Sequence, residues 1–143
     1  MLESNVIQYR GFHNIVEDGK VTGFQLCIRS DYYRGVWLSQ LRPGKVVVDG
    51  VTYPKESVIW QINGKDYTVD ELAEAGNDFW RITDTATLKI PKEGGLEQGF
   101  HNVSVRFAAS CSYMPPFLDQ FDEDGDDRSF NGGTYTRENM IIV

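Results

Sequence analysis

The side chains that most often carry chemistry are few in this sequence and stand far apart. It contains two histidines, His13 and His101, and two cysteines, Cys27 and Cys111, with no HxH, HxxxH or CxxC spacing among them. Such spacings bring the ligands of an intrinsic zinc or manganese centre together. We therefore expect two reduced, partly buried thiols, an exposed His13 beside a turn, and His101 at the core edge with a local hydrogen bond.

No nucleophile motif is present either. The sequence has no GxSxG elbow, no glycine-rich phosphate loop after a strand and no cysteine with an evident histidine partner. Carboxylate pairs for glycoside hydrolysis could be drawn from Asp31, Asp78, Asp84 or Glu97, but a chain with 21 acidic residues always offers such pairs. We assign no catalytic residue and no metal ligand to this chain, and a hydrolase with paired acids is the weakest alternative.

The acidic run DQFDEDGDD, residues 119–127, matches a calcium-binding loop only in composition. With Gly125 at the sixth position of an EF-hand loop, Gln120 takes the first position and Asn131 the twelfth. The first carboxylate and the bidentate final glutamate are both missing. We expect a solvated or partner-facing loop, with a weak cation site as the alternative.

The strongest functional signal in the sequence is a set of aromatic and arginine side chains at positions outside the regular strand patterns. They gather at residues 32–37, 79–81 and 113–117. Tyr, Trp, Met and Arg are enriched at the centres of protein interfaces, because they bury much area and keep a hydrogen-bonding tip. Core packing must account for roughly half of these aromatic side chains, and Trp60, in register with Val58, belongs to the core. The candidate partner or active-site-mouth contacts are Tyr32, Tyr33, Arg34, Trp37, Tyr113, Met114, Pro115 and Phe117.

Strands with alternating polarity must position these segments. In VTGFQLCIRS, residues 21–30, every second side chain from Phe24 to Ile28 is apolar, which is the pattern of a half-buried strand. A longer run starts at residue 100, and one of its faces carries His101, Val103, Val105, Phe107, Ala109 and Cys111. We expect its other face to be wet; that face carries Asn102, Ser104, Arg106 and Ser110.

Turn and cap signals complete the fold prediction. Asp49-Gly50 and Asn63-Gly64 each separate two β-rich runs and suit a type I′ turn. One or two helical turns, capped by Thr68 or Asp70 and ended by Gly76, are the one helical candidate. About eight or nine short strands with turns at about ten-residue spacing indicate an all-β fold. We predict an antiparallel β-sandwich, with a small barrel as the alternative.

Length and composition indicate a single domain over residues 1–143. Residues 113–135 contain Pro115-Pro116, the acidic run and Gly132-Gly133, and they predict one long irregular loop near the C-terminus. Loops of about 20 residues in a compact domain are usually functional or disordered. A closing strand is expected over 134–143.

The charge balance and the N-terminal sequence bear on partners and location. A net charge of −7 and a pI near 4.7 argue against nucleic acid and anionic membranes as partners. Residues 1–10 lack the basic start and apolar run of a signal peptide, and no stretch approaches the roughly 18 apolar residues of a membrane span. We expect a soluble, cytoplasmic protein.

Five short motifs follow one another along the chain: G-x-V-x-G-F at 19–24, YYRGVWLS at 32–39, VVVDG at 46–50, GGLEQGFHNVSV at 94–105 and SYMP at 112–115. In this order they resemble the beta (small) subunit of bacterial C-glycoside deglycosidases. Together they span most of residues 10–116, whereas the acidic stretch 119–133 is longer than the family's usual ending.

The resemblance implies a β-sandwich subunit that works with a larger alpha subunit in a hetero-oligomer. The alpha subunit is expected to be a TIM barrel that carries the catalytic histidine and a divalent metal, usually manganese, while this chain holds no cofactor. The complex would be a carbon–carbon lyase that releases an aromatic, flavonoid-type aglycone from a 3-oxo C-glycoside. The alternative is a free-standing carbohydrate-binding module that stacks sugars on Tyr32, Trp37 or Trp80.

Overall fold

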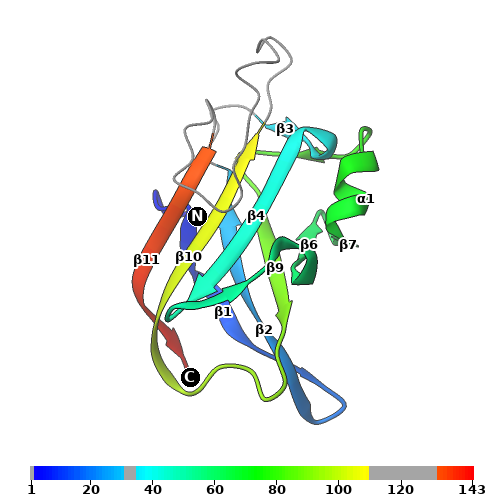
Figure 1. Ribbon diagram of the computed structural model, residues 1–143. Coiled ribbons are helices and arrows are strands. Elements are labelled where there is room, and N and C mark those ends of the chain that lie inside the picture. The colour runs from blue at the N-terminus through cyan, green and yellow to red at the C-terminus, as the bar shows by residue number, and fades with distance from the viewer. Residues whose placement is uncertain (1, 31–34, 110–131) are drawn as a thin grey trace.

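Two antiparallel sheets packed face to face form the protein (Figure 1). The computed structural model describes residues 2–30, 35–109 and 132–143. The first sheet has the order β1-β2-β9-β6-β7, with β1 Ile7–Glu17, β2 Lys20–Arg29, β9 Thr85–Pro91, β6 Ile59–Ile62 and β7 Lys65–Tyr67. The second has the order β11-β10-β4-β5, with β11 Gly132–Ile142, β10 Gly99–Ala109, β4 Leu41–Val48 and β5 Val51–Tyr53. The predicted β-sandwich is confirmed.

The described residues contain more strands than the eight or nine predicted, namely eleven. Two of the additional strands, β3 (Val36–Trp37) and β8 (Phe79–Trp80), form a small sheet of their own. Two residues are too few for an alternating pattern, so the sequence gives no sign of either strand.

The core lies between the two large sheets, and aromatic side chains fill its centre. Trp60 of β6, Trp80 of β8 and Phe107 of β10 pack with ring centroids 6.0 to 6.1 Å apart. The alternation predicted for β2 is confirmed, because Phe24 and Ile28 are fully buried. Each fully buried large apolar side chain contributes about 1.5–3 kcal/mol, so this layer dominates the stability of the sandwich.

Three tight turns connect neighbouring strands with positive φ at both central residues. Asp49-Gly50 joins β4 to β5 with φ values of 50° and 84°, and Asn63-Gly64 joins β6 to β7 with 55° and 78°. Both predicted hairpins are confirmed. A third, Asp18-Gly19, joins β1 to β2 with 52° and 78°. Asp and Asn tolerate this conformation better than most residues and glycine adopts it freely, which explains the dipeptides.

The predicted helical turn is α1, Val69–Glu74, and Thr68 is its cap. The Thr68 hydroxyl accepts the Glu71 N–H at 3.2 Å, and the Glu71 carboxylate accepts the Thr68 N–H at 3.0 Å, which is a capping box. The helix ends at Glu74 with Ala75 as its C-cap, just before Gly76. Within the described residues, the helices are all too short to cross a membrane.

Arg106 overturns part of the prediction for β10. It alternates with Val105 and Phe107 and so points to the outer face, yet it is 1% exposed and donates a hydrogen bond to the Thr134 hydroxyl at 2.9 Å. The backbone of Gly44 also lies against it. Alternation predicts the face of the sheet to which a side chain points, but it does not predict whether other residues cover that face. Arg106 is therefore buried at a position that we expected to be exposed to solvent.

β11 confirms the predicted closing strand and shortens the predicted loop. It begins at Gly132, so residues 132–135 are strand and not part of the loop 113–135. The EF-hand alignment over 120–131 and Cys111 fall outside the described residues. Cys27 is a free, half-buried thiol with its Sγ atom 3.4 Å from the Thr87 hydroxyl.

β1 and β11 are neighbours along one side of the sandwich and join the two sheets. The Arg137 guanidinium donates to the Ile7 carbonyl at 2.8 Å, pairs with the Glu3 carboxylate at 2.9 Å and stacks on the Tyr9 ring at 3.6 Å. The Tyr9 N–H and then Arg137 hold the pKa of Glu3 below its ordinary value. The N-terminal segment is thereby fastened to the last strand.

Candidate functional site

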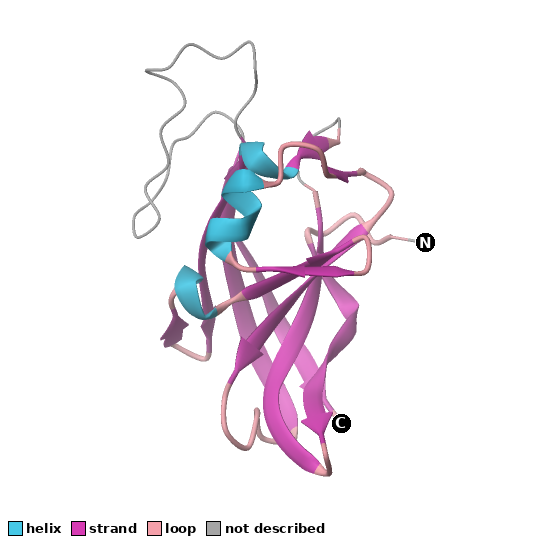
Figure 2. Cartoon of the chain, turned by 90° about the vertical axis from the view of Figure 1, so that its right-hand side faces the viewer, coloured by secondary structure: helices cyan, strands magenta, loops and turns pink. Residues whose placement is uncertain are grey.

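The end of the sandwich at which β3 and β8 lie is the candidate contact surface (Figure 1; Figure 2). We call it the rim and define it by Gly35–Trp37, η1 (Leu38–Gln40) and residues 78–82. Of the eight predicted contact residues, Trp37 lies within the described residues and is on the rim. The other seven lie outside the described residues: Tyr32, Tyr33, Arg34, Tyr113, Met114, Pro115 and Phe117.

Trp37 is held on the rim with its ring half exposed. The residue is 46% exposed, and its ring meets the Phe79 ring edge to face, with centroids 4.9 Å apart and an angle of 73° between the ring planes. The backbone N–H of Trp37 donates to the side-chain oxygen of Gln40 at 3.1 Å. Val36, one residue earlier, is buried in the core, so alternation within β3 directs Trp37 outward. This arrangement offers a fixed aromatic surface to a partner.

Gly35 allows β3 and β8 to approach closely. A Cβ atom at this position would lie 2.2 Å from an atom of the Phe79 ring and 2.7 Å from the Trp80 carbonyl oxygen. Glycine is therefore required here for close packing. The same ring that Gly35 contacts is the one on which Trp37 rests, so Gly35 positions the exposed aromatic pair.

Asp78 supports the rim from below. Its carbonyl accepts the Leu38 N–H at 2.9 Å, and its carboxylate accepts the Tyr67 hydroxyl at 2.7 Å. Burial and then this hydrogen bond raise the pKa of Tyr67 to about 12. Asp78, one of the four carboxylates considered for hydrolysis, is therefore engaged in holding η1 against β7.

Trp80 is not a sugar-stacking platform, which corrects one element of the carbohydrate-binding alternative. It is 0% exposed, and its indole N–H donates to the Asp84 carbonyl at 2.9 Å. A groove of about 320 Å³ does cross the solvent side of the five-stranded sheet. Its described lining includes Ile15, Ile59 and the Lys89–Asp66 ion pair but no aromatic side chain. Stacking of sugar rings in this groove is therefore not supported.

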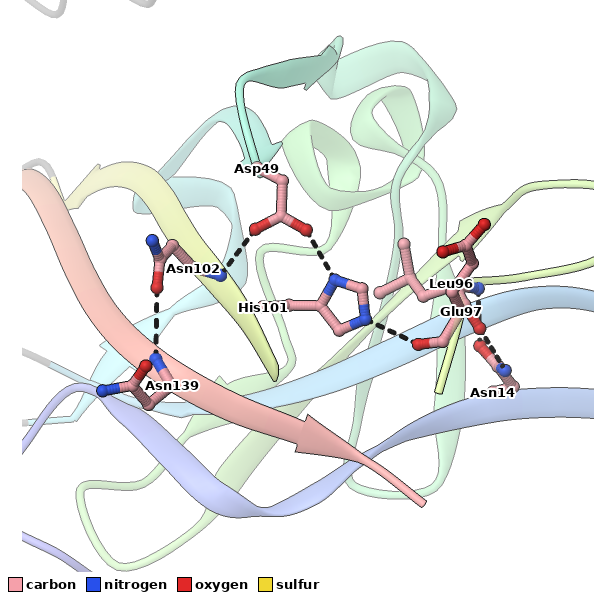
Figure 3. A network of polar contacts seen from close by, with 7 residues as sticks. All are labelled: Asn14, Asp49, Leu96, Glu97, His101, Asn102 and Asn139. Atoms are coloured by element: carbon pink, nitrogen blue, oxygen red, sulfur yellow. Dashed lines mark hydrogen bonds and ion pairs between the residues drawn. The ribbon is translucent and has the colours of Figure 1, made fainter. Parts of the chain in front are cut away.

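A second polar centre lies at the other end of β10, where His101 joins three segments (Figure 3). The ring Nδ1 atom is 2.5 Å from the Asp49 carboxylate, and Nε2 is 2.6 Å from the Glu97 carbonyl. The second Asp49 oxygen accepts the Asn102 N–H at 2.8 Å. The predicted core-edge histidine is confirmed, with 9% of its surface exposed.

The electrostatics of this centre follow from its hydrogen bonds. Burial would lower the pKa of His101, but the Glu97 carbonyl and the Asp49 carboxylate outweigh burial and raise it. Burial would likewise raise the pKa of Asp49, but the Asn102 N–H and His101 lower it. Both ring nitrogens are engaged, so His101 is not placed to act as a general base.

Sequence reasoning missed Asp49 as a partner of His101, because its position before Gly50 already explains it as a turn residue. The available signal was the pair of motifs: VVVDG contains Asp49, and GGLEQGFHNVSV contains Glu97, His101 and Asn102. The two motifs meet in space. Among the described residues, no group of three or more His, Cys, Asp or Glu side chains is placed to hold a metal ion.

Comparisons with known proteins agree with the sequence motifs. The family "C-glycoside deglycosidase beta subunit" matches residues 2–113. The C-glycoside deglycosidase beta subunit of Eubacterium cellulosolvens is 39% identical, over 99% of both chains. That of Microbacterium trichothecenolyticum is 36% identical over 61% of this chain and 66% of its own. The chain belongs to the family of C-glycoside deglycosidase beta subunits.

Proposed function

We propose that this chain is the beta subunit of a heteromeric C-glycoside deglycosidase, with a TIM-barrel alpha subunit as its partner. Family membership is the observation that carries the proposal. The exposed Trp37–Phe79 pair gives it a surface for such a partner, because half-exposed aromatic side chains on a fixed backbone are typical of interface centres.

The proposed reaction breaks the carbon–carbon bond between C1 of a 3-oxo sugar and an aromatic, flavonoid-type aglycone. The ketone at C3 acidifies the C2 hydrogen, and a base removes that proton. The resulting electron pair forms a C1–C2 double bond, and the aglycone carbon leaves with the C1 bond pair and takes up a proton. The enzyme is thus a lyase.

The base and a divalent metal, manganese, are proposed to lie in the alpha subunit. The described residues of this chain do not fit a metal ion, since they bring no set of three suitable ligands together. The two described histidines are also unsuited to proton abstraction from a sugar. His101 has both nitrogens engaged. His13 is exposed, as predicted, but lies within β1 and not beside a turn, and its Nδ1 atom contacts the Asn14 carbonyl. This chain would therefore act as an accessory subunit.

The rim is proposed to contact the alpha subunit or to cover the mouth of its active site. β10 ends and β11 begins beside the rim, because Ala109 pairs with Leu41, the residue after η1, and Ala108 pairs with Gly132. Assembly of a larger hetero-oligomer and a cytoplasmic location stay predictions.

Co-expression tests the proposed complex. This chain and an isomerase-like TIM-barrel alpha subunit should co-elute in size exclusion, and release of aglycone from a 3-oxo C-glucoside should require both chains. Full turnover by the alpha chain without this chain would overturn the accessory role.

Replacing Trp37 tests the rim as the contact surface. Trp37→Ala should weaken the complex by about 1–3 kcal/mol in a calorimetric titration, with little loss of folding stability, because the ring is half exposed. Phe100→Ala is the matched control: Phe100 is a 69% exposed aromatic residue at the other end of β10 and should leave binding unchanged. If both variants bind the alpha subunit as tightly as the wild-type chain does, the interface does not include Trp37. The proposed complex itself would still stand.

A further inference from the structure

The ring of His101 faces a hydrogen-bond acceptor on both sides. Nδ1 meets the Asp49 carboxylate at 2.5 Å, and Nε2 meets the backbone carbonyl of Glu97 at 2.6 Å. A neutral imidazole carries one N–H and one lone pair, so it satisfies one such contact and turns a lone pair toward the other acceptor. Both acceptors receive a hydrogen bond only when both ring nitrogens carry hydrogen.

We propose that His101 is a doubly protonated imidazolium at neutral pH and acts as a proton-dependent latch that fastens residues 97–98 to the β4–β5 turn. This goes beyond the proposed function and does not depend on it, because every group involved belongs to this chain.

The remaining contacts of Asp49 keep the negative charge on that side. Its second oxygen accepts the Asn102 N–H at 2.8 Å, which favours the carboxylate over the protonated acid. The Glu97 carboxylate adds a smaller negative influence on the His101 ring than Asp49 does. The other neighbours carry no charge: Phe12 of β1 meets the His101 ring edge to face, and the Asn102 amide oxygen accepts the Asn139 N–H of β11. The nearby titratable group on β5 is Tyr53, whose pKa is raised by burial and then by the charge of Asp49.

The first part of the β9–β10 connection is held without His101, because the Lys92 and Gly94 N–H groups donate to the Thr22 and Val21 carbonyls of β2 at 3.0 and 3.1 Å. Between β9 and β10 the chain passes through Gly94 and Gly95, both with positive φ. Asn14 fixes Leu96 through two hydrogen bonds of 2.8 and 2.9 Å. Glu97, which follows, is bound to β10 by its carbonyl contact with His101. Loss of the ring proton at Nε2 removes this contact and frees residues 97 and 98 from β10.

Ring ¹⁵N spectra of the full-length chain give the direct test. At pH 7, both ring nitrogens of His101 should show the shifts of N–H groups, and the titration midpoint should therefore lie above pH 7, where an ordinary histidine with a midpoint of about 6.5 is mostly neutral. The chain has one other histidine, so His13→Gln assigns the signals. A singly protonated ring at pH 7 would overturn the proposal.

Two asparagine substitutions isolate the contribution of Asp49. Asp49→Asn keeps a residue that type I′ turns favour, so the hairpin should survive, and it removes the charge beside His101. The His101 midpoint should fall. Asp18→Asn makes the same change in the equivalent Asp18-Gly19 turn, which has no histidine bound, and should leave the midpoint unchanged. An unchanged midpoint in Asp49→Asn would refute the latch.

The conformational part of the proposal has its own readout. Backbone amide shifts of Leu96 to Gly99 should titrate with the same midpoint as the His101 ring, and those of the Asn63-Gly64 turn should not. If the amide shifts at 96–99 do not change as the His101 ring titrates, the ring charge does not control this segment, and the proposal is overturned.

Discussion

At the scale of single residues, the segments that pack over a side chain decide whether it is buried, and the sequence pattern alone does not. Trp60 could be assigned to the core from its register, and the structure agrees. Arg106 and Trp80 could not be placed correctly, because charge suggests exposure and an irregular position suggests a surface, whereas both are buried. Neither property is encoded locally; each depends on which distant segment covers the side chain.

Gly35 gives a sharp prediction at this scale. Gly35→Ala forces a methyl group within 2.2 Å of the Phe79 ring and within 2.7 Å of the Trp80 carbonyl. We expect a loss of about 1–3 kcal/mol in the free energy of unfolding, measured by urea denaturation. The loss should be accompanied by a change in the near-UV signal of the Trp37–Phe79 pair.

Gly76 supplies the matched control for this substitution. A Cβ there would meet the Ser39 hydroxyl at 3.7 Å, an ordinary contact, and the residue does not have positive φ. Gly76→Ala should leave stability unchanged or raise it by about 0.4–1 kcal/mol through the unfolded chain. Equal effects of the two substitutions would contradict the close-packing argument at Gly35.

At the scale of elements, the sequence predicts a turn or a helix cap well when the interacting residues are close together in the chain. The Asp-Gly and Asn-Gly turns and the Thr68 cap each act within four residues, so the sequence contains all that is needed. The β3–β8 sheet is the opposite case. Its pairing joins Trp37 to Phe79, which lie 42 positions apart in the sequence, and no local signal operates over such a separation.

The capping box of α1 can be tested by substitution. Thr68→Ala removes the acceptor for the Glu71 N–H, and we expect a loss of about 1 kcal/mol in the free energy of unfolding. Glu71→Gln retains a side-chain oxygen for the Thr68 N–H and should cost less than Thr68→Ala. Chemical denaturation of both variants measures the difference, and the reverse order would mean that the box does not stabilise the helix.

At the scale of the whole molecule, the Asp49–His101 pair makes stability depend on pH. The raised pKa of His101 means that its contribution is fully present below about pH 6.5 and is lost as pH rises through the folded-state value. The lowered pKa of Asp49 means that its contribution is present above about pH 3.9 and is lost as pH falls through the folded-state value.

Comparison of the wild-type chain with Asp49→Asn should show this window. The difference in unfolding free energy should be largest between about pH 4 and 6.5 and should narrow on both sides. Urea denaturation at a series of pH values measures it, with Asp18→Asn as the control that shows no such maximum. A difference that grows steadily above pH 8 would contradict the assigned charges.

The overall architecture could be predicted from the sequence, and the candidate contact surface only in part. Alternation and turn dipeptides are repeated along the chain, so the sandwich follows from many weak signals that agree. Trp37 alone among the predicted contacts is placed by the described residues, where its aromatic character and its neighbour Val36 set its direction. The Asp49–His101 contact spans 52 positions and was beyond local reasoning.

The position of β11 has a consequence for how the chain is made. β11 pairs with β10 and also binds β1 through Arg137 and Ile7, 130 positions apart, and it is the last described strand to be synthesised. Until it leaves the ribosome, β10 has an open edge, and open edges pair readily with other chains. Pairings between distant segments also form slowly. The nascent chain therefore exposes this edge to other chains in the interval between the synthesis of β10 and that of β11.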